Sequence, residues 1–147
     1  MKISVQAEPF DYGSLSNEFA QGHTHVGAIV TFCGIVRDDE LGDLSTMEIE
    51  HYPGMTEKAI QAHAKTAKER FSLSEVLVIH RYGSLKPGEM IMMVATAAPH
   101  RNDAFHGAEF LMDYLKSRAP FWKKELVNGE PRWVDAKPED EDALSRW

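Results

Sequence analysis

The sequence predicts an α+β fold in which a mostly antiparallel sheet is covered by two long helices. Short segments with strand-like apolar patterns outnumber the helical segments along the chain. Residues 55–71 and 100–118 instead carry apolar side chains at helical spacing. A length of 147 residues suits one domain closed around one core, so we expect residues 1–147 to form a single domain.

The first expected elements are a strand, a helix and a second strand. Ile3 and Val5 alternate with polar residues, which is typical of a half-buried strand. Residues 12–20 can form a short helix. Residues 26–36 are apolar on both alternating faces, so we expect this strand to be buried on both sides.

The middle of the chain predicts a strand, a long helix and two further strands. Residues 47–51 alternate apolar and acidic side chains, and Pro53 and Gly54 follow as a turn. Two apolar strands are expected at 76–79 and 90–96. The long helix over 55–71 should bury one apolar stripe: Met55, Ala59, Ala62 or His63, Ala67 and Phe71.

The last part of the chain predicts the second long helix and a hairpin. Pro120 disfavours helix at the residue before it, so the helix over 100–118 should end there. The turn residues Asn128 and Gly129 join two short strands, after which we expect a polar tail. The helix should bury a second stripe: Phe105, Ala108, Met112 and Leu115.

Charge and composition exclude several functions. The sequence has 16 basic and 23 acidic residues and a net charge of −7, which argues against nucleic-acid binding by bulk charge. Its single cysteine, Cys33, permits no intrachain disulfide. The N-terminus lacks the apolar stretch of a signal peptide, and no apolar run approaches the roughly 20 residues of a membrane span. We therefore expect a cytoplasmic protein without a membrane or nucleic-acid partner.

A local excess of positive charge lies within residues 113–125. Lys116 falls in the last turn of the expected helix, where the helix dipole favours a cation. Lys123 follows Phe121 and Trp122, and an ammonium among aromatic side chains loses hydration, which lowers its pKa. Such a lysine can transfer protons near neutral pH. The alternative is a helix end that carries ordinary solvated cations.

Three more cations lie at the ends of expected elements. His100 and Arg101 begin the helix over 100–118, where free N–H groups and a guanidinium can bind a phosphate. Arg37 follows the strand over 26–36 and so lies at the rim of the core. The alternative is that all three are ordinary surface residues.

No metal or cofactor site is indicated. His23 and His25 have no Cys or carboxylate at ligand spacing. Cys33 has apolar neighbours, which raise the pKa of a thiol and lower its reactivity. The motifs GxGxxG, GxxxxGK[ST] and GxSxG are absent. From the residues alone, the chain is an α+β domain with a candidate anion pocket and two lysines of interest.

Several segments together resemble one family, in order, through almost the whole chain. The combination of HYPGM and LKSRAPFWK is highly specific, and it is similar to the large subunit of molybdopterin synthase. The resemblance ends at RWVDA (132–136) and the terminal RW. It is carried by TFCGIVR (31–37), EHYPGMTEKA (50–59), IHRYGSLKPGE (79–89), APHR (98–101) and MDYLKSRAPFWKKE (112–125).

The resemblance implies a fold, partners and a reaction. The family has an α/β hammerhead fold with a small β subdomain, and it forms homodimers. Each large subunit binds one small ubiquitin-like sulfur carrier, which gives a heterotetramer. The carrier's Gly-Gly C-terminus bears a thiocarboxylate, whose sulfur is transferred to cyclic pyranopterin monophosphate. The product is the dithiolene of molybdopterin, in molybdenum cofactor biosynthesis, and no cofactor is implied for the enzyme.

The resemblance also implies the residues that act on the sulfur donor. Lys116 matches the family's essential lysine beside the thiocarboxylate, and Lys123 matches a second active-site lysine. Our hypothesis is that Lys116 is the acid/base and that Lys123 stabilises charge beside it. Phe32 and Met112 match residues that line the channel for the carrier's tail.

A second set matches the residues that bind the anionic substrate. It comprises Arg37 together with His100 and Arg101, the latter pair contributed across the dimer. Lys137 lies where relatives have an arginine near the substrate phosphate, and a lysine lacks that bidentate geometry.

Two other functions stay open at the level of sequence. A non-catalytic docking module for a ubiquitin-like sulfur carrier would use the same groove without the chemistry of the lysines. A hydrolase of cyclic phosphates would act without any carrier, and the absence of metal-ligand spacing makes it the weaker rival.

Overall fold

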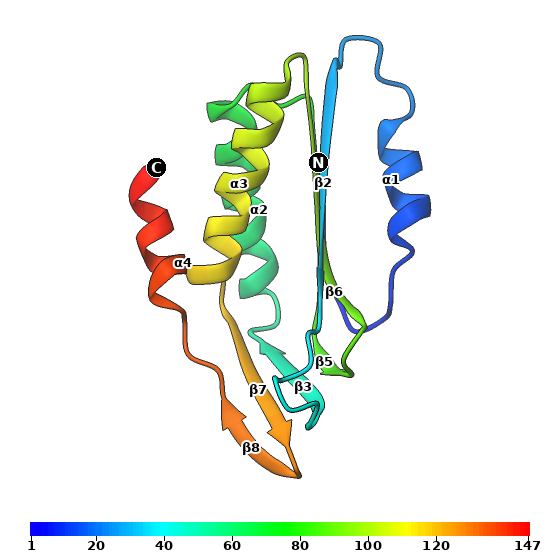
Figure 1. The fold of residues 1–147 in the computed structure, drawn as a ribbon. Helices are drawn as coiled ribbons and strands as arrows, with labels where there is room; N and C mark the ends of the chain where they lie inside the picture. The colour runs from blue at the N-terminus through cyan, green and yellow to red at the C-terminus, as the bar shows by residue number, and fades with distance from the viewer.

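Two four-stranded sheets organise the chain, and the computed structural model describes all of residues 1–147 (Figure 1). In the first sheet only β1 and β4 pair in parallel. All pairs of the second sheet are antiparallel, so the predicted mostly antiparallel α+β fold is confirmed. The first sheet runs in the order β1 (Lys2–Gln6), β4 (Glu75–Arg81), β6 (Met90–Ala98) and β2 (Ala28–Ile35). The second runs β5 (Gly83–Leu85), β3 (Leu44–His51), β7 (Phe121–Val127) and β8 (Glu130–Trp133).

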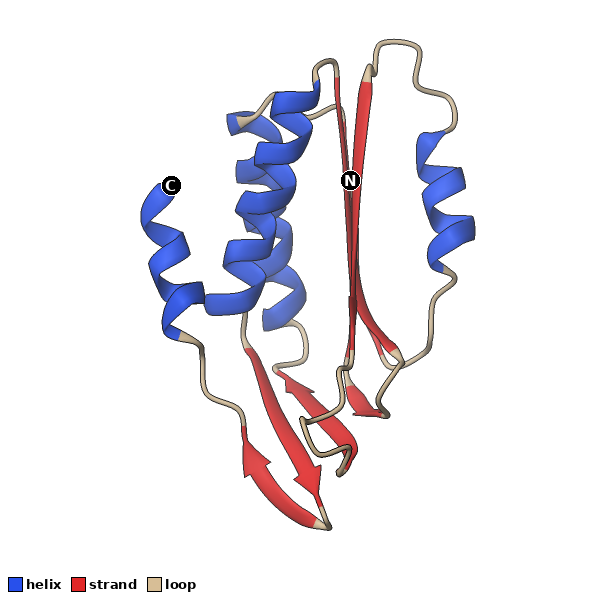
Figure 2. Ribbon diagram, in the orientation of Figure 1, coloured by secondary structure: helices blue, strands red, loops and turns tan.

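Two long helices cover one face of the first sheet, as predicted (Figure 2). They are α2 (Met55–Arg70) and α3 (Arg101–Ser117), whereas α1 (Tyr12–Ala20) lies on the opposite face. A short helix α4 (Pro138–Ala143) and one 3-10 turn (Leu144–Arg146) follow the second sheet. No helix combines the length and apolarity needed to cross a bilayer.

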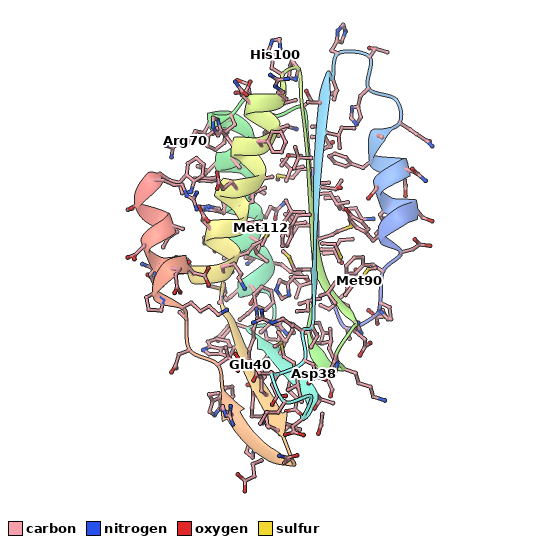
Figure 3. All side chains as sticks on the ribbon, viewed as in Figure 1. Asp38, Glu40, Arg70, Met90, His100 and Met112 are labelled. Carbon is pink, nitrogen blue, oxygen red and sulfur yellow. The ribbon has the colours of Figure 1, made fainter.

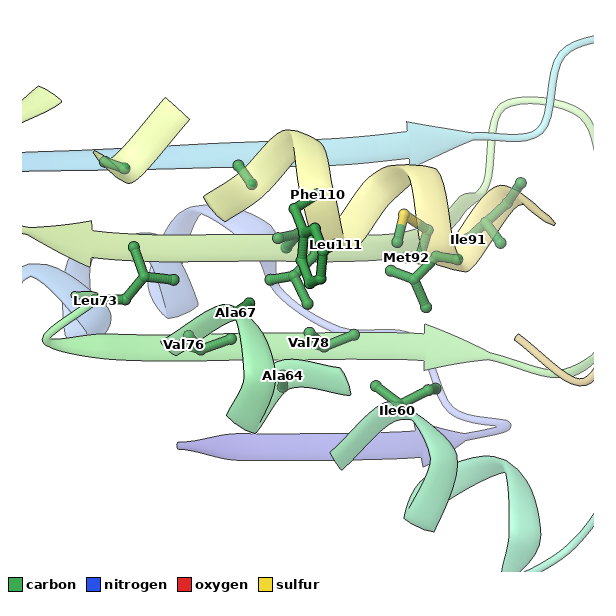
Figure 4. Packing of buried hydrophobic residues seen from close by; sticks show 14 of the residues in the cluster. Ile60, Ala64, Ala67, Leu73, Val76, Val78, Ile91, Met92, Phe110 and Leu111 are labelled. Carbon is green, nitrogen blue, oxygen red and sulfur yellow. The ribbon is translucent and has the colours of Figure 1, made fainter. Parts of the chain in front are cut away.

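The main core lies between the two long helices and the first sheet (Figure 4). Leu111 of α3 is 1% exposed and packs in the same cluster as Ile60 of α2 and Val78 of β4. Gly107 brings α3 close to the loop after α2, since a Cβ on it would lie 2.7 Å from the Leu73 side chain. This packing fixes the direction of α3 and therefore the place where the helix ends.

The expectation of a strand buried on both sides over 26–36 is wrong. The corresponding strand β2 lies at the edge of the first sheet and has only β6 as a neighbour. Phe32 is 41% exposed and Ile35 is 54% exposed. Because an uninterrupted apolar run reads the same at a sheet edge and in its centre, the pattern could not separate the two. The strands buried on both faces are β4 and β6.

The expected apolar stripe of α2 is confirmed at Ala67, which is fully buried, but it is wrong at the start of the helix. Met55 is 56% exposed, whereas Thr56 is fully buried. The Thr56 hydroxyl accepts a hydrogen bond from the Tyr52 N–H and donates one to the Pro120 carbonyl, so its burial leaves no polar atom unpaired. The buried stripe is Thr56, Ile60, Ala64 and Ala67. On α3, Phe105 was expected to be buried but is 59% exposed.

The end of the chain is folded back on α3 and is not the polar tail expected from its composition. The Trp147 indole Nε1 donates a hydrogen bond to the Asp113 carboxylate at 2.6 Å. Its ring packs edge-on against Phe71 and Phe110, at centroid distances of 5.5 and 5.4 Å. The Ser117 hydroxyl donates a hydrogen bond to the Asp140 carbonyl at 2.9 Å. These contacts hold α4 against the C-terminal end of α3.

Candidate active site

Two adjoining cavities lie where α3 ends and β7 begins, and Leu115, Lys116 and Lys123 line both. The larger, of about 280 Å³, we name the apolar cavity. Its further wall includes Phe32, Ile35, His80, Met92 and Met112. The smaller, of about 140 Å³, we name the polar cavity. Its further wall includes Ser117, Phe121, Asp135, Lys137 and Asp140.

The two lysines reach the boundary of the cavities from different elements. Lys116 lies in the last turn of α3, where the unpaired carbonyl groups of the helix end favour a cation. Lys123 is on β7 and pairs in register with Ile49 of β3. Side chains alternate along a strand, so Lys123 points into the cavities while its neighbour Lys124 points away and pairs with Glu48 at 3.2 Å.

Burial makes Lys123 a weaker base than an ordinary lysine. Its pKa is lowered to about 8, first because the cavity walls desolvate the ammonium and second because the charge of Lys116 repels it. The carboxylate of Asp140 acts in the opposite direction and raises this pKa. The lowered pKa expected from the sequence is thus confirmed. Trp122, one of the two aromatic residues on which that expectation rested, is 49% exposed.

His80 is part of the wall of the apolar cavity. It lies on β4, is 2% exposed, and stacks on Phe121 with ring centroids 3.8 Å apart. Desolvation by burial, with the charges of Lys123 and Lys116, lowers its pKa to about 3. The His80 ring is therefore neutral at physiological pH.

The structure brings five of the eight sequence-predicted site residues together. Lys116 and Lys123 lie at the boundary, and Lys137 lies in the polar cavity, just before α4. Phe32 of β2 and Met112 of α3 lie in the apolar cavity. These residues come from four separate parts of the chain, which the fold places side by side.

The other three predicted residues do not line either cavity within one chain. His100 and Arg101 are exposed at the opposite end of α3 (Figure 3). With a rise of about 1.5 Å per residue, the helix places His100 roughly 24 Å from Lys116. Arg37 is exposed two residues beyond Ile35, at the end of β2 that borders the apolar cavity. The expectation that a second subunit supplies His100 and Arg101 stays a prediction.

Two residues of the site were missed from the sequence. His80 follows the apolar run of β4, and a single histidine in a strand gives no spacing signal. Asp140 belongs to the acidic run at 139–142, which reads as a solvated tail. Only the fold-back of the chain brings Asp140 next to the lysines.

The arrangement suits a reaction between two anions. Three lysines face the polar cavity against two aspartates, so a phosphate-bearing ligand meets a net positive wall. The apolar cavity suits a slender chain that ends in a charged group at Lys116 and Lys123. A lysine with a pKa of about 8 can donate or accept a proton at the point where the two ligands would meet.

Comparison with known proteins gives a consistent family. The family described as "MoaE protein" matches residues 5–118. The chain is 62% identical over 147 residues to the molybdopterin synthase catalytic subunit of Cereibacter sphaeroides, with 100% of both chains covered. It is 46% identical to the protein of the same name from Haemophilus influenzae, with 100% of this chain and 98% of the relative covered.

Solved structures agree with this result. The molybdopterin biosynthesis MoaE protein from Burkholderia ambifaria superposes with a TM-score of 0.84 at 46% identity, covering 99% of this chain and 97% of that one. Molybdopterin synthase from Staphylococcus aureus superposes with a TM-score of 0.81 at 28% identity, covering 90% and 96%. The chain therefore belongs to the MoaE family of molybdopterin synthase catalytic subunits.

Proposed function

We propose that this chain transfers sulfur from the C-terminal thiocarboxylate of a small ubiquitin-like carrier to cyclic pyranopterin monophosphate, forming the dithiolene of molybdopterin. The observation that carries the proposal is that Lys116 and Lys123 line both cavities at once. A donor tail in the apolar cavity and a phosphorylated acceptor in the polar cavity would meet at these two cations. Family membership supports the same reaction.

The residues have separate roles in this proposal. Phe32 and Met112 flank the carrier's glycine tail, and Lys137 binds the substrate phosphate. Lys116 transfers protons during sulfur addition and opening of the cyclic phosphate, because both steps need an acid or a base. Lys123 is its partner: it offsets the mutual repulsion of the two anions and, with a pKa of about 8, can exchange a proton at the same boundary.

The assembly and the location of the protein belong to the same proposal. The exposed residues His100 and Arg101, with Arg37, would complete an anion site in a homodimer, in which each subunit also binds one carrier. The resulting heterotetramer would work in the cytoplasm. The main core includes Leu44, Ile49 and Leu85 of the second sheet along with residues of the first, which supports one domain over 1–147.

The reaction is tested by mixing the purified chain with thiocarboxylated carrier and pterin precursor and detecting the dithiolene product. We expect product only when the carrier bears the thiocarboxylate. The matched control is the same carrier ending in an ordinary carboxylate. Phosphate opening without any carrier would favour the hydrolase alternative, and carrier binding without product would favour the docking module.

A further inference from the structure

Gly34 lies on the face of β2 that is turned toward the long helices. Side chains alternate along a strand, and Val30 and Val36, which are an even number of residues from Gly34, pack in the main core. The Thr31 hydroxyl, on the other face, is hydrogen-bonded to that of Tyr12 in α1. Gly34 is therefore the one position of β2 that presents no side chain to the helices.

The space left by Gly34 belongs to the apolar cavity. Gly34 lines this cavity together with Phe32, which lies on the same face of β2, and Met92, its register partner on β6. A Cβ on Gly34 would lie 3.3 Å from Met92 Cγ, 3.5 Å from Met92 Sδ and 3.6 Å from Phe32 Cε1. Because both of these side chains line the cavity, such a Cβ would fill part of the space between them.

The fold itself does not require glycine at position 34. Its backbone is outside the left-handed region that favours glycine. The three atoms that a Cβ would meet first are all side-chain atoms, and the nearest belongs to the flexible Met92. Gly27 is different, since a Cβ there would collide with the Pro99 carbonyl oxygen. Glycine inside a strand is less stable than alanine, so Gly34 lowers stability without a conformational or packing reason.

The space at Gly34 fits a peptide that has no side chains. The apolar cavity has a volume of about 280 Å³, which is small for a peptide with bulky side chains. A glycine main chain is the most slender peptide, and beside Gly34 it meets no Cβ on the strand. Lys116 and Lys123 in the wall of the same cavity provide cations for a charged chain end.

We propose that Gly34 is a specificity-determining residue of the apolar cavity: the missing side chain leaves the space beside Phe32 and Met92 in which the terminal glycines of the carrier lie. The inference rests on the proposed function, because it names the feature of the carrier that this cavity selects. A methyl group on Gly34, or on a glycine of the tail, would fill the same space. The cavity therefore selects a tail without side chains.

The first test measures carrier binding and stability in Gly34→Ala. Calorimetry gives the Kd for a carrier that ends in Gly-Gly, and thermal unfolding gives the Tm. We expect the Kd to rise at least about tenfold, because the added methyl group overlaps the tail. The Tm should stay the same or rise.

Gly13→Ala is the matched control. Gly13 lies in α1, on the opposite face of the first sheet, and its backbone is also outside the left-handed region. A Cβ on it would meet only Asp11 Oδ1, at 3.7 Å. This variant should leave the Kd for the carrier unchanged.

The outcomes separate this inference from the proposed function. Equal Kd values for Gly34→Ala and the unsubstituted chain would overturn the inference alone. A lower Tm in Gly34→Ala would also overturn it, because the glycine would then serve the fold. Absence of carrier binding by the unsubstituted chain would reject the proposed function, and this inference with it.

A second measurement uses the unsubstituted chain and so does not depend on the folding of a variant. The last two residues of the carrier are changed from Gly-Gly to Ala-Ala, and the two Kd values are compared by calorimetry. We expect the Ala-Ala carrier to bind at least about tenfold more weakly, because its methyl groups need the space beside Gly34. Equal affinities would contradict selection for a tail without side chains.

Discussion

Lys116 at the end of α3 and Lys123 on β7 line the same two cavities, and the charge of Lys116 lowers the pKa of Lys123. The two residues lie on either side of Pro120, where the chain leaves the helix and enters the second sheet. The two lysines are therefore brought together by the short connection between α3 and β7.

Replacing Lys116 should make Lys123 more basic. Lys116→Met removes a repelling charge, so we expect the pKa of Lys123 to rise from about 8 toward its ordinary value. NMR titration of 13C-methylated lysines measures this rise. Lys137→Met is the matched control, because Lys137 lines the same polar cavity but is not among the causes of the Lys123 shift. An equal rise in both variants would show that the effect is not specific to the pair.

Replacing Lys123 should stabilise the fold in a pH-dependent way. The folded-state pKa of about 8 lies below the ordinary 10.5, so the unfolded chain binds more protons between these values. The destabilisation is complete below pH 8 and fades as the pH rises toward 10.5. Discounting the part of the side chain that water reaches, we expect Lys123→Met to gain about 2 kcal/mol at pH 7.

Urea unfolding at pH 7 and at pH 10.5 measures this difference. Most of the gain should be absent at the higher pH. Lys124→Met is the control, because Lys124 pairs with Glu48 outside both cavities and should lack this pattern. A gain of the same size at both pH values would mean that packing, and not charge, is its source.

The carrier and the pterin should depend on different cavities for binding. Phe32→Ala shortens a wall of the apolar cavity, so we expect the Kd for the carrier to rise about tenfold with little change in KM for the pterin. Lys137→Ala removes a cation from the polar cavity, so the KM for the pterin should rise about tenfold with little change in carrier affinity. Calorimetry and steady-state kinetics measure both. Parallel losses in both variants would argue against two separate subsites.

Trp147 should matter for stability although its segment reads as a tail. Trp147→Ala removes the ring from Phe71 and Phe110 and leaves Asp113 without its indole donor. We expect a loss of about 2 kcal/mol in the free energy of unfolding. The control is Trp133→Ala, since Trp133 is 56% exposed and should change stability by about 0.5 kcal/mol or less. Denaturant titration measures the free energy of unfolding of both variants. Equal losses would show that the packing of Trp147 does not stabilise the fold.

The sequence was most informative where a periodic pattern was long. The helix expected over 55–71 is observed at Met55–Arg70, and the one expected over 100–118 at Arg101–Ser117. Short apolar patterns were less informative about environment. The apolar run of β2 could not reveal that this strand lies at the edge of its sheet. The burial of Thr56 could not be predicted either, because its hydroxyl is satisfied by the carbonyl of Pro120, far away in the chain.

The candidate site shows the same limit. Lys116 and Lys123 could be found because they are close in sequence and gather charge in an acidic chain. His80 and Asp140 could not, since their place at the site depends on sheet order and on the return of the C-terminal segment to α3. Non-local packing brings them there, and no local pattern records it.

The most direct test of the central claim is single-turnover dithiolene formation by Lys116→Ala, with saturating thiocarboxylated carrier and pterin precursor. If proton transfer at the boundary of the two cavities depends on Lys116, the rate should fall at least about a hundredfold, while the neighbouring surface variant Arg118→Ala keeps its activity. Full turnover by Lys116→Ala would contradict the claim.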